Sequence, residues 1–257
     1  MNYISTRGLF KKSWETVKAN FFKIVGTTFV LFIIQSILDK ATRIDPESRM
    51  TPDMGIVAFF GTILSFVIGV AITAAIIRIA RGADVTVHVF SLTFLQVLRY
   101  FGAVILIMLI MTAFIIPVVA TAFALGIFSM APFVGGLTGA IFPVDITGAI
   151  IAFGVVALVA IVGFIYINMR LMFATYLIVD TNTEVIAALK QSWQLTRGEV
   201  WTIVKLALLS MLVAILGVLA LLVGLLVAIP VIAFAYAHLY LALVSRNQAP
   251  VLPTHNE

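Results

Sequence analysis

Six long apolar stretches constrain this chain more than any other feature of its sequence. A helix needs about 20 mainly apolar residues to cross the roughly 30 Å hydrocarbon core of a bilayer. Each stretch approaches or exceeds that length. The sequence therefore predicts six transmembrane helices, at about Phe21 to Leu38, Met54 to Ile79, Tyr100 to Leu125, Ala149 to Met172, Val200 to Leu216 and Ala220 to Val244.

The composition excludes a soluble, disordered or fibrous protein. Charged residues make up 11% of the 257 residues, whereas a soluble domain carries about 25%. Mean hydropathy is +1.19. We therefore expect an all-α integral membrane protein in which residues 1–257 form one six-span domain. The polar segment Met1 to Asn20 lacks the features of a signal peptide, so the first span is expected to stay uncleaved.

The distribution of Lys and Arg predicts the topology. Of 16 basic residues, only Lys40, Arg43 and Arg49 fall on one side of the predicted spans. Basic residues flank spans on the cytoplasmic side, so both termini are expected in the cytoplasm. This rule also explains the net charge of +5, and nucleic acid is not an expected partner. The same side holds three expected interfacial anchors, Trp14, Trp193 and Trp201.

An amphipathic helix is expected to lie in the cytoplasmic interface before each odd-numbered span. Phe10, Trp14 and Val17 share one face of the first, with Lys11, Lys12 and Lys18 opposite. Ile186, Leu189 and Trp193 repeat the pattern. For that second helix we expect a capping box from Thr181 and Glu184 and a stop at Gly198. The segment Val87 to Leu98 is a weaker copy.

These helices begin three predicted quasi-repeats, 5–82, 83–180 and 181–246, followed by a short tail, 247–257. Aligning Leu9 to Val25 with Ala188 to Val204 pairs Ser13 with Ser192 and Trp14 with Trp193. A unit of two spans returns to the side where it began, so the copies insert in parallel. The prediction is three parallel pairs of spans about an axis along the membrane normal, which argues against inverted-repeat transporters.

Prolines and glycines interrupt the apolar pattern. Pro117 and Pro230 are expected to kink the third and sixth spans, as static kinks rather than gating hinges. The segment Gly126 to Gly148 is apolar but contains two prolines and repeated glycines. It is too irregular for a full span, and both a re-entrant hairpin and an interfacial loop remain open.

No pattern of residues predicts catalysis or metal binding. No Asp, Glu, Lys or Arg lies near the centre of a span, which argues against an ion-coupled pump. We expect His238 to be a neutral imidazole, hydrogen-bonded within the bundle with Tyr236 or Asn168. The carboxylates between Asp39 and Asp53 alternate with basic residues, as in a solvated loop. We therefore expect no catalytic residue, no metal site and no cofactor.

Two stretches resemble a known family: Arg170 to Asp180, and Ala188 to Trp201 with Ser192, Trp193 and Gly198. They are similar to the YciC-like inner-membrane proteins of bacteria and to the membrane domain attached to some glycerophosphodiester phosphodiesterases. The resemblance implies a six-helix domain of the bacterial inner membrane without assigned catalytic residues. We expect no hydrolase activity, because the catalytic domain of those enzymes has no counterpart here.

Two functions are therefore compared. The first is a non-enzymatic scaffold or accessory subunit that contacts the anionic leaflet, with any protein partner unknown. The second is a transporter for a small solute or a lipid, with a pathway lined by polar side chains such as Asn168 and His238. For the first, basic residues near the leaflet contribute about 1 kcal/mol each. The candidates for binding lipid headgroups are Lys11, Lys12, Lys18, Arg99, Lys190 and Arg197.

Overall fold

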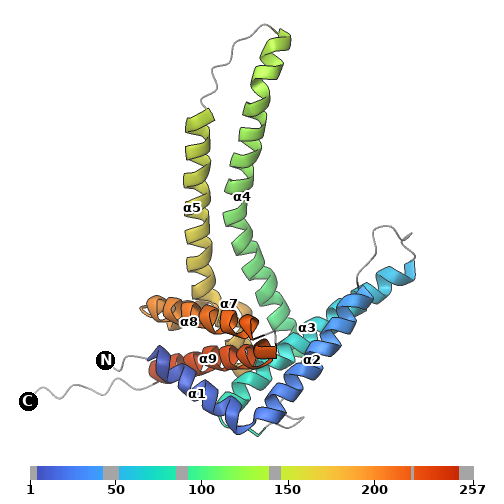
Figure 1. The fold of residues 1–257 in the computed structure, drawn as a ribbon, viewed down its shortest axis with the longest axis vertical. Helices are drawn as coiled ribbons and strands as arrows, with labels where there is room; N and C mark the ends of the chain where they lie inside the picture. Colours follow the sequence, from blue (N-terminus) through green and yellow to red (C-terminus); the bar gives the residue numbers. More distant parts are fainter. Residues whose placement is uncertain (1–4, 43–51, 85–91, 139–145, 221–222, 249–257) are drawn as a thin grey trace, which may run out of the picture.

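A computed structural model describes residues 5–42, 52–84, 92–138, 146–220 and 223–248. Within these ranges the secondary structure consists of helices joined by turns (Figure 1). The helices are α1 (Thr6–Ala19), α2 (Phe21–Thr42), α3 (Pro52–Ala80), α4 (Phe94–Thr138), α5 (Ile146–Leu171), α6 (Ala174–Thr181), α7 (Val185–Leu195), α8 (Val200–Leu219) and α9 (Val223–Gln248).

Among the described residues, five segments are long and apolar enough to cross a membrane. They lie in α3, α4, α5 with α6, α8 and α9, where the second to sixth spans are expected. The predicted first span falls within α2, a helix of 22 residues in which several side chains lie outside the described part. The chain is thus a multi-pass membrane protein that is helical throughout its described spans, and the first of the six expected spans stays a prediction.

Two expectations for the connecting segments are wrong. Helix α4 has 45 residues and continues without interruption past Gly126 to Thr138, so the irregular segment does not begin at Gly126; residues 139–145 lie outside the described part. In addition, the expected capping box is absent. Thr181 closes α6, donating to the Leu177 carbonyl at 2.8 Å, and Glu184 precedes α7 without capping it through its side chain. Helix α6 was not predicted as a separate helix, because the apolar sequence continues from α5 past Arg170.

The weaker third amphipathic segment also differs from its expectation. Residues 85–91 lie outside the described part, and the chain is helical from Phe94 directly into the third span. Phe94 to Leu98 is therefore the first turn of α4 rather than part of a separate helix. Nothing interrupts the helix before Tyr100, because the apolar pattern is continuous across this point.

The main buried core lies where the ends of several helices meet. It combines Ile77 near the end of α3, Ala103 near the start of α4 and Phe173 after α5. Leu206 of α8 and Leu239 of α9 complete it. We call this region the basic end, because Arg81, Arg99, Arg170, Arg197 and Arg246 lie in or beside its helix ends.

From the basic end, three pairs of neighbouring helices extend in different directions (Figure 1). Helix α2 contacts α3, α4 contacts α5, and α8 contacts α9. The pairs are not parallel to one another, unlike the expected bundle. The positions of the buried residues explain this arrangement. The core that joins the three pairs lies at the basic end, and few buried residues join one pair to another farther along the helices.

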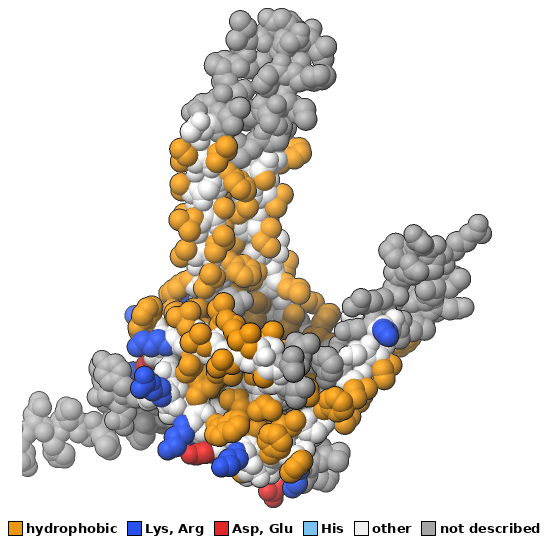
Figure 2. Space-filling model, in the orientation of Figure 1, with side chains coloured by type: hydrophobic (Ala, Val, Ile, Leu, Met, Phe, Trp, Pro, Cys, Tyr) orange, Lys and Arg blue, Asp and Glu red, His pale blue; other side chains and the backbone are white. Residues whose placement is uncertain are grey.

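The distal parts of the helices expose large apolar side chains. Figure 2 shows apolar side chains covering the described lengths of α4 and α5. Phe123 of α4 and Val159 of α5 are among the most exposed. Contiguous apolar surface of this extent is typical of contact with lipid, as expected for helices that cross a membrane.

Close packing of α8 on α9 depends on Gly224, which yields a first prediction. A Cβ atom at Gly224 would lie 2.7 Å from the Gly217 carbonyl oxygen and 2.8 Å from the Ala220 Cβ. We expect Gly224→Ala to lower the free energy of unfolding by about 1–3 kcal/mol, the usual cost of overpacking. Gly154→Ala is the control, because no atom beyond its chain neighbours and the nearby backbone of its own helix lies within 4 Å of its Cβ position in the described part of the chain. Equal melting temperatures for the two variants in detergent would contradict the prediction.

Candidate functional site

The candidate headgroup residues are mostly exposed at the basic end. Lys11, Lys12 and Lys18 are exposed on α1, and Lys190 and Arg197 are exposed on and after α7. None of these five takes part in an ion pair within the described part of the chain. Figure 2 shows basic side chains gathered at the lower left of the molecule, away from the apolar surface of α4 and α5.

Arg99 is the exception among the six candidates. Its guanidinium is half-buried and donates to both the carbonyl oxygen and the side-chain oxygen of Asn182. Asn182 ends α6 with a left-handed backbone, φ +53°, a conformation that Asn tolerates better than most residues. Nearby, Gln96 Nε2 donates to the Val179 carbonyl at 3.2 Å. Arg99 and Gln96 therefore fix the start of α4 to the end of α6.

Helix α1 is fixed to α9 through a buried serine. The Ser13 hydroxyl lies 2.7 Å from the Leu9 carbonyl and 3.1 Å from His238 Nδ1. Both Ser13 and His238 are buried, and His238 Nε2 has no hydrogen-bond partner in the described part of the chain. The expectation of a hydrogen-bonded imidazole within the bundle is confirmed, but its partner is Ser13 rather than Tyr236 or Asn168.

Helix α7 is fixed to the end of α5 in a similar way. The Ser192 hydroxyl donates to the Arg170 carbonyl at 2.8 Å, and Thr196 lies 3.4 Å from the same oxygen. The buried guanidinium of Arg170 lies over the Trp193 ring at 4.4 Å and over the Tyr166 ring at 5.6 Å. Cation–π contacts contribute about 2 kcal/mol when they are desolvated. Arg170 thus has a packing role.

Positions paired by the predicted repeat have similar burial. Ser13 and Ser192 are both buried, as are Val17 and Thr196. The paired tryptophans are both partly exposed, Trp14 by 48% and Trp193 by 39%. Trp201, the third expected anchor, is 66% exposed. In both α1 and α7, a buried serine therefore faces a neighbouring helix while a tryptophan lies at the surface.

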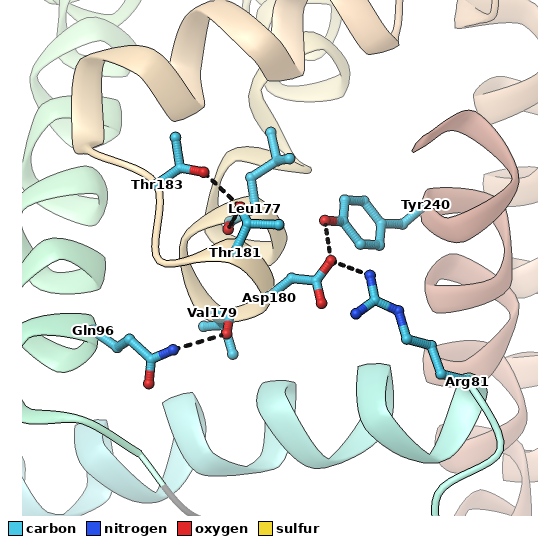
Figure 3. Close-up of polar contacts among 8 residues, drawn as sticks. All are labelled: Arg81, Gln96, Leu177, Val179, Asp180, Thr181, Thr183 and Tyr240. Atoms are coloured by element: carbon cyan, nitrogen blue, oxygen red, sulfur yellow. Dashed lines mark hydrogen bonds and ion pairs between the residues drawn. The ribbon is translucent and has the colours of Figure 1, made fainter. Parts of the chain in front are cut away.

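A buried carboxylate joins three helices at the basic end (Figure 3). The Asp180 side chain, at the end of α6, is only 3% exposed. Its Oδ2 accepts from Arg81 Nη2 at 2.5 Å and from the Tyr240 hydroxyl at 2.7 Å. Arg81 follows α3 and Tyr240 belongs to α9, so one carboxylate connects α3, α6 and α9. Sequence reasoning missed this cluster, although an acidic residue closing an apolar segment on the basic side was a usable signal.

An apolar groove of about 490 Å³ lies between α1, α8 and α9. Phe10, Lys11 and Trp14 line it from α1. Val213 of α8 and Val227 of α9 are among the residues of the opposite walls. Lys11 is the only charged residue among the described residues of the lining. The groove was not predicted, because it depends on how α1 lies across the α8–α9 pair.

The expected absence of a metal site and the candidate lining of a transport pathway can be compared with the described side chains. In the described ranges, no three His, Cys, Asp or Glu residues lie together as metal ligands would. Among the polar side chains of the predicted spans, the Thr73 hydroxyl donates to the Gly69 carbonyl of its own helix, and His238 is hydrogen-bonded to Ser13. Pro230 lies inside α9 and Pro117 inside α4, as expected, while the kinks and their role stay predictions.

Comparison with known proteins agrees with the resemblance noted in the sequence. No curated protein and no solved structure was found to match the chain. One family model does match: residues 141–246 match the family described as the membrane domain of glycerophosphoryl diester phosphodiesterase. This segment is less than half of the chain and contains α5 to α8 and most of α9, including Arg170, Asp180 and Trp193.

Proposed function

We propose that this chain is a non-enzymatic membrane domain that binds anionic phospholipid and acts as a scaffold or accessory subunit. In this proposal it lies in a bacterial inner membrane with the basic end and both termini in the cytoplasm. The observation that carries it is a set of exposed Lys and Arg side chains, Lys11, Lys12, Lys18, Lys190 and Arg197, that have no ion pair with a described carboxylate and lie on or near helices that bear half-exposed tryptophans. Such residues fit the headgroup region of an anionic leaflet.

The paired burial of α1 and α7 supports the proposed interfacial helices. Each helix buries a serine face against the domain and keeps its lysines exposed, Lys11 and Lys12 on α1 and Lys190 on α7. In a leaflet, about 1 kcal/mol for each basic residue sums to a substantial preference for anionic lipid. The same pattern supports the proposed repeat, because equivalent positions share their environments.

Replacement of the five exposed basic residues and Arg99 by Gln tests the proposal. We expect the sixfold variant to insert correctly and to retain at least tenfold less phosphatidylglycerol than the wild type, measured by native mass spectrometry from a mild detergent. A control variant replaces Lys40, Arg43 and Arg49, which lie on the opposite side in this topology. Unchanged lipid retention in the correctly inserted sixfold variant would overturn the proposal.

A further inference from the structure

We propose that the groove between α1, α8 and α9 is a specific site for an acyl chain of an anionic phospholipid, whose phosphate lies at Lys11. This inference rests on the proposed function and names the site at which one lipid is held. Its walls are apolar apart from Lys11, as a hydrocarbon chain requires. Its volume of about 490 Å³ falls in the range of small-ligand pockets, about 300–1,000 Å³.

Charge complementarity selects an anionic lipid as the occupant. Lys11 is exposed and has no ion pair within the described ranges, so its ammonium is available to a phosphate. Its methylene groups can follow the apolar wall while the charge stays at the polar surface. Trp14 is half-exposed on the same helix, and indole rings favour the depth of lipid headgroups.

Trp193, which the predicted repeat pairs with Trp14, has neighbours that Trp14 lacks. Around Trp193, the place beside the ring is filled from within the chain by Arg170 and Tyr166. Around Trp14, which the repeat pairs with Trp193, the groove remains open. The two units thus differ in their filling, and the open one offers its apolar wall to a lipid chain.

Two pairs of matched variants test the site by native mass spectrometry of the full chain with equal amounts of phosphatidylglycerol and phosphatidylcholine. Val213→Trp places a large ring in the groove, whereas Leu212→Trp adds the same ring at an exposed position outside the lining. We expect Val213→Trp to reduce the amount of tightly retained phosphatidylglycerol at least tenfold. Leu212→Trp should change that amount by less than twofold.

Lys11→Gln and Lys40→Gln form the second pair and avoid any burden on folding, since both side chains are exposed. Lys40 is predicted to lie on the opposite side of the membrane, so we expect Lys11→Gln to reduce the preference for phosphatidylglycerol about fivefold and Lys40→Gln to leave it within twofold. Equal effects in both pairs would overturn the groove site. Lipid retention that falls only in the sixfold variant would then preserve the proposed function, and retention that is unchanged there would remove both.

Discussion

Replacing Arg81 with alanine is expected to lower the free energy of unfolding by about 3 kcal/mol. The change leaves the buried Asp180 carboxylate with Tyr240 as its remaining partner. Removing one member of a buried ion pair costs about 3–5 kcal/mol, because the other charge stays desolvated. We take the low end of that range, since the Arg81 side chain is 47% exposed and solvent screens it.

The double variant Arg81→Ala with Asp180→Asn isolates the cause. An amide in place of the carboxylate removes the unpaired charge and still accepts from the Tyr240 hydroxyl, so we expect most of the lost stability to return. Lys190→Ala serves as a control for loss of an exposed cation without an ion pair. Reversible unfolding of the purified protein in mixed detergent micelles measures all four proteins. A double variant as unstable as Arg81→Ala would contradict the argument.

The long helices of this protein could be predicted from the sequence because each is marked by a local apolar pattern. The span expected at Ala149 to Met172 corresponds to α5, Ile146–Leu171, and that expected at Val200 to Leu216 to α8, Val200–Leu219. Length and hydropathy determine these elements. The same signal failed for α6, since a short helix after a longer apolar one adds no new period to the sequence.

The contacts among helices could not be predicted, because they depend on residues far apart in the chain. Asp180 and Tyr240 are separated by 60 positions, and Ser13 and His238 by 225. Each of these polar atoms could have satisfied its hydrogen bonds in several ways. Arg99 illustrates the consequence: composition made it a candidate for lipid headgroups, whereas the fold uses it to hold Asn182.

Trp193→Ala is expected to lower the free energy of unfolding by about 3 kcal/mol, whereas Trp14→Ala lowers it by about 1 kcal/mol. The two tryptophans hold equivalent positions in the predicted repeat and have similar exposure. Their main difference is electrostatic, since the Arg170 guanidinium lies 4.4 Å from the centre of the Trp193 ring, which also has an edge contact with Tyr166. The difference of about 2 kcal/mol is the value of a desolvated cation–π contact.

Trp193→Phe separates the contact from the loss of volume. Phenylalanine keeps an aromatic face for Arg170 but binds a cation less well than indole, so its stability should fall between those of the wild type and Trp193→Ala. Equal losses for Trp193→Ala and Trp14→Ala would show that Arg170 gains nothing from the ring. A larger loss at Trp193 would mean that one unit of the repeat is closed by its own side chains, while its counterpart keeps an apolar groove open beside Trp14.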